Sequence, residues 1–290
     1  RVHNAINKLR PDSILLGETR TTPHLSQMEF IYDSTFGGEV LPRLTQQKPE
    51  QWVPLLKQFL DRDEAAMPSA YASGLMRYSE NHDTATALRR YGSGHRDSLL
   101  ALTFLIPGLP LVNMDQEQGA GQLIAKLAEI RKRPEFIRGE AVYGTTGSSD
   151  PAVLTFTRRM PEQFSAVAIN FTGQRKAVTL TLPPECGKTT LPFRELLHGI
   201  SATRNSGELR FELEPYGTGV FAFSTANAPR LSRMPEQKLS APEQKASLLL
   251  KNKFWTAGFR NGFPVFLKTG TGVNMLAEMC CVSDHFAIRD

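Results

Sequence analysis

The chain has 290 residues, of which 40% are hydrophobic and 22% charged, a composition typical of soluble globular proteins with one or two domains. Its formal net charge is +5, but the basic residues occur as scattered short pairs without regularly spaced aromatics, which argues against a nucleic-acid interface. No apolar run is long enough to cross a membrane as a helix. The sequence therefore predicts neither a nucleic-acid nor a membrane partner.

The first part of the chain alternates helical patterns with short apolar runs. Residues 2–9 and 51–60 carry apolar side chains at helical spacing, whereas residues 19–45 show little periodicity and predict a long connection. Further helices are predicted over residues 84–91, with Asp83 or Thr84 as N-cap, 97–105 and 122–133. The apolar runs are nearly continuous, as strands buried in a parallel sheet require, and they occupy residues 13–17, 75–80 and 110–114.

Two of these apolar runs end in acidic side chains. The first stops at Glu18, and the second leads into Asn81, His82 and Asp83. In a parallel α/β sheet the carboxyl ends of the strands, with the loops that follow them, build the active site. Paired carboxyl groups at that edge suit glycosidic bond chemistry, in which one acid protonates the leaving oxygen and negative charge faces a developing oxocarbenium ion.

From Ala141 onward the apolar pattern changes from helical spacing to alternation. Residues 225–247 are rich in Pro, Ser, Gln and charged side chains, which is typical of a linker. Residues 248–290 regain apolar content and predict the start of a further β module or an unstructured tail. Before the linker, β-rich segments separated by Gly, Pro and Asn indicate an antiparallel sandwich; they span residues 153–157, 165–170, 177–182, 208–213 and 219–223.

Three cysteines provide no disulfide framework, and free thiols favour a reducing, cytoplasmic environment. Cys280 and Cys281 lie near Asp284 and His285, but their spacing matches no zinc pattern, so no metal site is predicted. Residues 268–272 contain Lys, Thr and Gly, yet they lack the spacing of a phosphate-binding loop and predict a hairpin turn.

These features together resemble the later part of the α-amylase family, glycoside hydrolase family 13. Leu-Leu-Gly-Glu-Thr at 15–19 is similar to the family's fifth-strand motif, and Glu-Asn-His-Asp at 80–83 is similar to its seventh-strand motif. Other matches are the eighth-strand signature at 107–110 with 116–119, the last barrel helix at 123–138 and the closing β-domain strand at 214–223. The resemblance implies a partial (β/α)8 TIM barrel, with only the later strands, over residues 1–139, and an all-β sandwich over 140–224.

The resemblance also implies roles for the residues at the strand ends. Glu18 matches the general acid/base, and Asp83 matches the residue that stabilises the transition state. His82 would hydrogen-bond the sugar, and Asn81 would line the substrate site and orient the turn. Glu80 would support the strand end rather than perform chemistry. The implied substrate is an α-glucan or oligosaccharide, hydrolysed or transferred with retention and without a cofactor.

The chain departs from the family pattern near the expected substrate. Thr86 occupies a position where the family often has Arg, and Met114 with Asp115 replaces an aromatic–Gly pair. Glu117 has a family counterpart that we interpret as structural. The segment after the eighth strand is also short. These differences predict an altered specificity.

The family's nucleophilic Asp, in a fourth-strand Gly-x-Arg-x-Asp motif, and its third-strand Asp-x-x-x-Asn-His motif are absent. The near match at 258–262 has Gly at the nucleophile position and follows the β domain, so we attribute it to coincidence. We therefore expect an internal fragment that is inactive alone, with any structural calcium bound by the missing part. The alternative is a non-catalytic amylase-like protein that serves binding or assembly, but the presence of Glu18 and Asp83 argues against it.

Overall fold

The computed structural model describes residues 2–10, 13–18, 28–67, 72–188, 190–224, 248–251, 255–260 and 263–269. They belong to two compact units, residues 1–228 and residues 229–290. The predicted linker at 225–247 and the group Cys280, Cys281, Asp284 and His285 lie outside the described residues. Across the described parts of the chain, no helix is both long and apolar enough to span a bilayer.

The first unit begins with α1 (Val2–Leu9), which precedes a four-stranded parallel sheet. The predicted run at 13–17 contains its first strand, the run at 75–80 contains its third, and only the first residue of the run at 110–114 belongs to its fourth. Parallel pairing brings the carboxyl ends of all the strands to one edge. In hydrogen-bonded order the strands are β1 (Leu16–Gly17), β2 (Phe30–Tyr32), β3 (Leu75–Arg77) and β4 (Leu109–Pro110).

The strand β2 corrects the sequence analysis, which predicted only a connection across residues 19–45. Within that range the chain forms β2, a π-helix (Thr35–Val40) and α2 (Leu41–Leu44). The strand pairs on both sides, with Gly17 opposite Ile31 and Tyr32 opposite Met76. A strand of three residues is too short to display a period, so its neighbours rather than its local pattern define it.

Longer helices follow the strands, and they are α3 (Pro49–Ala66), α5 (Ala87–Leu105), α6 (Gly121–Arg131) and the short α7 (Pro134–Ile137). The helix α5 joins the two helices predicted at 84–91 and 97–105, with a non-helical φ of 79° at Gly92. Its N-cap is Thr86, whose hydroxyl accepts a hydrogen bond from the Arg89 N–H at 3.3 Å. The suggested caps, Asp83 and Thr84, are therefore wrong, because the helix begins later than the apolar pattern indicated.

The chain then forms two antiparallel sheets. The five-stranded sheet has the order β10-β13-β8-β7-β5 and the four-stranded sheet has the order β11-β12-β9-β6. The rings of Phe211 in one sheet and Phe221 in the other lie 4.5 Å apart, within one hydrophobic cluster that draws on both sheets. The elements are β5 (Glu140–Val142), β6 (Gly147–Ser148), β7 (Val153–Met160), β8 (Gln163–Asn170), β9 (Lys176–Thr181), α8 (Pro184–Gly187), β10 (Phe193–Glu195), β11 (Ala202–Asn205), β12 (Glu208–Leu213) and β13 (Thr218–Phe223).

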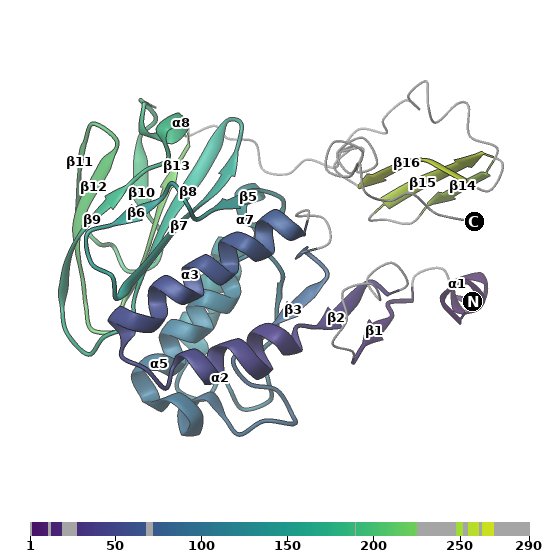
Figure 1. Cartoon of the computed structure of the whole chain (residues 1–290), viewed down its shortest axis with the longest axis horizontal. Helices are drawn as coiled ribbons and strands as arrows, with labels where there is room; N and C mark the ends of the chain where they lie inside the picture. The colour runs from purple at the N-terminus through teal and green to yellow at the C-terminus, as the bar shows by residue number, and fades with distance from the viewer. Residues whose placement is uncertain are drawn as a thin grey trace. The chain divides into compact units, whose positions relative to one another are not determined.

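Helix α3 lies alongside the antiparallel strands (Figure 1). The helices and these strands share a second hydrophobic cluster. Trp52 of α3 is fully buried, and its ring lies 4.6 Å from the ring of Phe171, which follows β8. Polar side chains of α3 add to this contact, because Asp61 and Glu64 accept hydrogen bonds at 3.1 Å from the backbone N–H groups of Gly144 and Ala141. The region that carries the parallel sheet is therefore packed directly against the β region.

The second unit contains a three-stranded antiparallel sheet of β14 (Leu248–Lys251), β15 (Trp255–Arg260) and β16 (Phe263–Thr269). Gly258 and Arg260 of the near match to the nucleophile motif lie on β15. Lys268 and Thr269, the first residues of the rejected phosphate-loop motif, lie at the end of β16. These motif residues therefore belong to strands rather than to a loop that precedes a helix.

Candidate active site

The predicted catalytic residues follow two strands of the parallel sheet. Glu18 comes directly after β1, and the Asn81–His82–Asp83 turn lies a few residues beyond β3. Only β2 separates these strands in the sheet. Because the strands are parallel, both loops emerge at the same edge, and residues 65 positions apart in the sequence can meet there.

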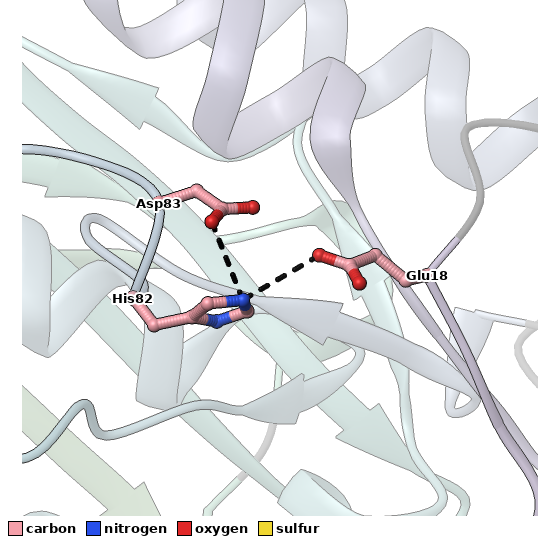
Figure 2. Close-up of side chains that lie close together, drawn as sticks. All are labelled: Glu18, His82 and Asp83. Atoms are coloured by element: carbon pink, nitrogen blue, oxygen red, sulfur yellow. Dashed lines mark ion pairs between the residues drawn. The ribbon is translucent and has the colours of Figure 1, made fainter.

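The side chains of Glu18, His82 and Asp83 do meet (Figure 2). The Nε2 atom of His82 lies 3.6 Å from Oε1 of Glu18 and 3.4 Å from Oδ1 of Asp83. One potential ligand atom from each of the three side chains lies within 4.8 Å of the others, so the two carboxylates are close neighbours. The expected convergence of the two carboxylates on one place is confirmed. Their catalytic roles stay predictions.

This group of three side chains is open to solvent. The side chains of Glu18, His82 and Asp83 are 63%, 58% and 66% exposed. At that exposure the ion pairs are screened by water and contribute little to stability. A sugar could reach both carboxylates directly, whereas a buried trio would need a conformational opening.

Asn81 differs from His82 and Asp83 because it is only 7% exposed. Its backbone N–H donates to Oγ1 of Thr84 at 3.0 Å, and its carbonyl accepts from the Thr84 N–H at 3.1 Å. The side-chain Oδ1 of Asn81 is buried without a hydrogen-bond partner. The backbone contacts shape the turn that presents His82 and Asp83, and substrate binding by the Asn81 side chain stays a prediction.

The positions expected to lie near the substrate, apart from the two motifs, have different surroundings. Thr86 caps α5, as described above. Met114 is 81% exposed, and Asp115 has a positive φ of 69° in the loop after β4. Glu117 in the same loop is exposed. None of these side chains belongs to the Glu18–His82–Asp83 group.

Two further residues, Tyr32 and Gln116, contact the residues of the site or connect its loops. The Tyr32 ring, at the end of β2, lies 6.2 Å from the His82 ring at an interplanar angle of 70°. Gln116 donates to Oγ of Ser79 at 3.2 Å and accepts from the Asn113 N–H at 3.1 Å, which connects the loops after β3 and β4. The local sequence around each residue does not specify these particular contacts.

A buried ion network lies beneath the site. Arg77 of β3 is 2% exposed and pairs with Asp33, at the end of β2, and with Asp63 of α3 at 2.6 Å. Its Nε donates to the Pro107 carbonyl at 2.9 Å. Burial acts against the charged guanidinium, but the two carboxylates outweigh it and raise the pKa of Arg77 above its usual range. The network fixes the ends of β2 and β3, from which the site loops emerge.

The described part of the chain contains no second group like Glu18, His82 and Asp83. Among the described residues, Glu18, His82 and Asp83 form the one group of potential ligands close enough to share a cation, but exposed acidic groups of this kind commonly hold none. The prediction of no metal stays a prediction. Two hollows of about 410 and 640 Å³ lie beside α3 and α6, away from these three residues.

Comparisons with known proteins agree on one fold. No protein-family model matches the chain. It is 24% identical over 182 residues to neopullulanase 2 of Thermoactinomyces vulgaris, which covers 54% of this chain and 31% of that protein. The α-amylase of Geobacillus thermoleovorans, solved with acarbose, matches with a TM-score of 0.63 and 15% identity over 77% of this chain and 56% of its own.

Other solved structures give similar values. A maltogenic α-amylase of Thermotoga neapolitana matches with a TM-score of 0.61 and 17% identity, over 77% of this chain and 57% of its own. The debranching enzyme of Nostoc punctiforme matches with a TM-score of 0.61 and 13% identity, over 76% of this chain and 54% of its own. The chain thus spans about half the length of these structures and under a third of the curated relative. The resemblance identified from the motifs is confirmed at the level of structure, and the chain has the α-amylase-type fold.

Proposed function

We propose that this chain is the later part of an α-glucan-active glycoside hydrolase or transglycosylase. The observation that carries the proposal is the meeting of Glu18 and Asp83, from loops after different strands, on either side of His82. In this proposal residues 1–139 form the later part of a TIM barrel and residues 140–224 form its C-terminal β-sandwich. The relatives named as amylases, a neopullulanase and a debranching enzyme support an α-glucan or oligosaccharide as substrate.

The proposed chemistry assigns a separate task to each member of the group. Glu18 protonates the glycosidic oxygen in the first step and deprotonates water or an acceptor sugar in the second. Asp83 accepts hydrogen bonds from the sugar hydroxyls, and these bonds strengthen as the ring flattens toward the oxocarbenium ion. His82 donates a hydrogen bond to the same sugar. No cofactor, nucleic acid or membrane takes part in this scheme.

A retaining reaction also needs a nucleophilic carboxylate, which the family carries in its Gly-x-Arg-x-Asp motif. No such motif occurs in the 290 residues, so we propose that they do not turn over substrate alone. The sheet order supports an incomplete barrel, because β1 and β4 are its two ends and Leu16 and Leu109 on them are 48% and 37% exposed. Poor solubility of the isolated chain is the expected consequence.

Turnover is the direct test of this function. A longer polypeptide that carries this chain together with a nucleophile strand should release reducing sugar from starch and maltooligosaccharides. Glu18→Gln should lower kcat by about 10³-fold, and Asp83→Asn by about 10²- to 10³-fold. The exposed Glu117→Gln serves as the matched control. Near wild-type rates in both site variants would refute the assignment.

The non-catalytic alternative is favoured by one observation, the absence of the nucleophile motif. A binding protein of this kind would retain maltooligosaccharide affinity but show no turnover in any longer form. Turnover by the 290-residue chain itself would contradict the proposal that this chain is inactive alone. It would indicate Asp83 as nucleophile, because its carboxylate lies near the separation typical of retaining pairs.

A further inference from the structure

The Glu80 side chain is a buried carboxylate next to the exposed group. It is 3% exposed, although it directly precedes the Asn81–His82–Asp83 turn. A buried charge requires compensating partners, because desolvation of an unpaired carboxylate is strongly unfavourable. The partners of Glu80 therefore show what this side chain does.

The principal partner of Glu80 is the start of α5. Its Oε2 atom accepts a hydrogen bond from the backbone N–H of Ala87, the first residue of that helix. The first N–H groups of a helix have no carbonyl partner within the helix, and a negative charge at this end is favoured by the helix dipole. Thr86 accepts from the Arg89 N–H further along the same turn. Glu80 thus satisfies an N–H that the helix itself leaves free.

The residues around Glu80 fix the turn from other directions. The hydrogen bond to Asp97 raises the pKa of Arg96, and Glu80 lies close enough to raise it further. Arg90 donates to the carbonyl of Ser79 at 3.1 Å, one residue before Glu80. The segment is consequently held to α5 at residues 79 and 80 and closed on itself at residues 81–84. Only His82 and Asp83 project from it to the solvent beside Glu18.

We propose that Glu80 is a positioning residue that keeps His82 and Asp83 opposed to Glu18 by anchoring their turn to the first N–H of α5. The catalytic meaning of this positioning rests on the proposed function, but the positioning itself does not. Glu80 touches no reacting atom and acts through the residues that follow it. The loop geometry that the site needs is thereby set by a helix cap and not by contacts among the exposed side chains.

The inference can be tested on the isolated chain by nuclear magnetic resonance, without substrate. Two signals report on it: hydrogen exchange of the Ala87 amide, and the cross-relaxation peak between the Tyr32 and His82 rings, whose centroids lie 6.2 Å apart. Glu80→Ala should speed Ala87 exchange by about tenfold or more and abolish the ring peak. Glu80→Gln retains an acceptor oxygen and should preserve both signals. The exposed Glu117→Ala should leave both unchanged.

The amides of Leu99–Leu105 and of β8 verify in each variant that the fold is intact. An intact fold with both signals retained in Glu80→Ala would overturn the proposal. If Glu80→Ala fails to fold, the Glu80→Gln variant serves instead. The proposal would then be overturned if this variant folds and keeps its Ala87 amide protected but loses the ring peak. Failure of the proposed function is distinguishable from failure of the positioning. In that case the longer protein shows no turnover, although the Glu80 variants change the two signals as expected.

Discussion

Replacement of Arg77 by Leu tests the buried network beneath the site. The guanidinium pairs with two carboxylates, and Asp33 is itself 7% exposed. Arg77→Leu leaves Asp33 buried without its cation and removes the donor to the Pro107 carbonyl. Breaking a buried pair from one side typically lowers the free energy of unfolding by about 3–5 kcal/mol. For a unit of this size that corresponds to a melting temperature lower by roughly 6–20 °C.

Urea unfolding followed by circular dichroism measures this difference, and Arg89→Leu, at an exposed position of α5, should stay within about 0.5 kcal/mol of wild type. Adding Asp33→Asn to Arg77→Leu should restore part of the loss, because the uncompensated charge is removed. The coupling free energy between the two changes should be about 1 kcal/mol or more. A loss below about 1 kcal/mol in Arg77→Leu would show that the network does not stabilise the strand ends, because leaving a buried carboxylate without its cation costs more than that.

Three further changes have defined outcomes. Gly139→Ala should lower the free energy of unfolding by about 1–3 kcal/mol, because the new Cβ would lie 2.4 Å from a backbone oxygen. Gly121→Ala, with open space around the new Cβ, should not lower it, and thermal unfolding measures both variants. Burial raises the pKa of the Glu64 carboxyl above its ordinary value, so stability should fall as pH rises above that ordinary value, and Glu64→Gln should flatten this slope in urea unfolding. Cys186, 3% exposed, should react with a thiol reagent only on unfolding.

Much of the fold could be predicted because its signals are local. The alternation after Ala141 identified the segments that became β7, β8, β9, β12 and β13. The apolar runs before Glu18 and Asp83 identified β1 and β3, and their order implied that both acids would lie at one edge. In each case a pattern of several residues encoded which face is buried.

The features that were missed depend on contacts between distant residues. The strand β2 has three residues and no period, and it exists because β1 and β3 pair with it on either side. The start of α5 is set by Thr86 and by the carboxylate of Glu80, seven positions before the first helical residue. The side chain of Asn81 is buried, although His82 and Asp83, which follow it in the same motif, are exposed. No local pattern specifies such partners.

Titration of the isotope-labelled chain with maltotetraose, followed by nuclear magnetic resonance, would show whether the proposed site binds α-glucan. The central claim is that Glu18, His82 and Asp83 form a single site for α-glucan. Binding to part of a site should be weak, with dissociation constants in the millimolar range, and chemical shifts should change first at these three residues. The changes should vanish in the Glu18→Gln, Asp83→Asn double variant. An absence of shifts at this group, or equal shifts in the double variant, would contradict the account.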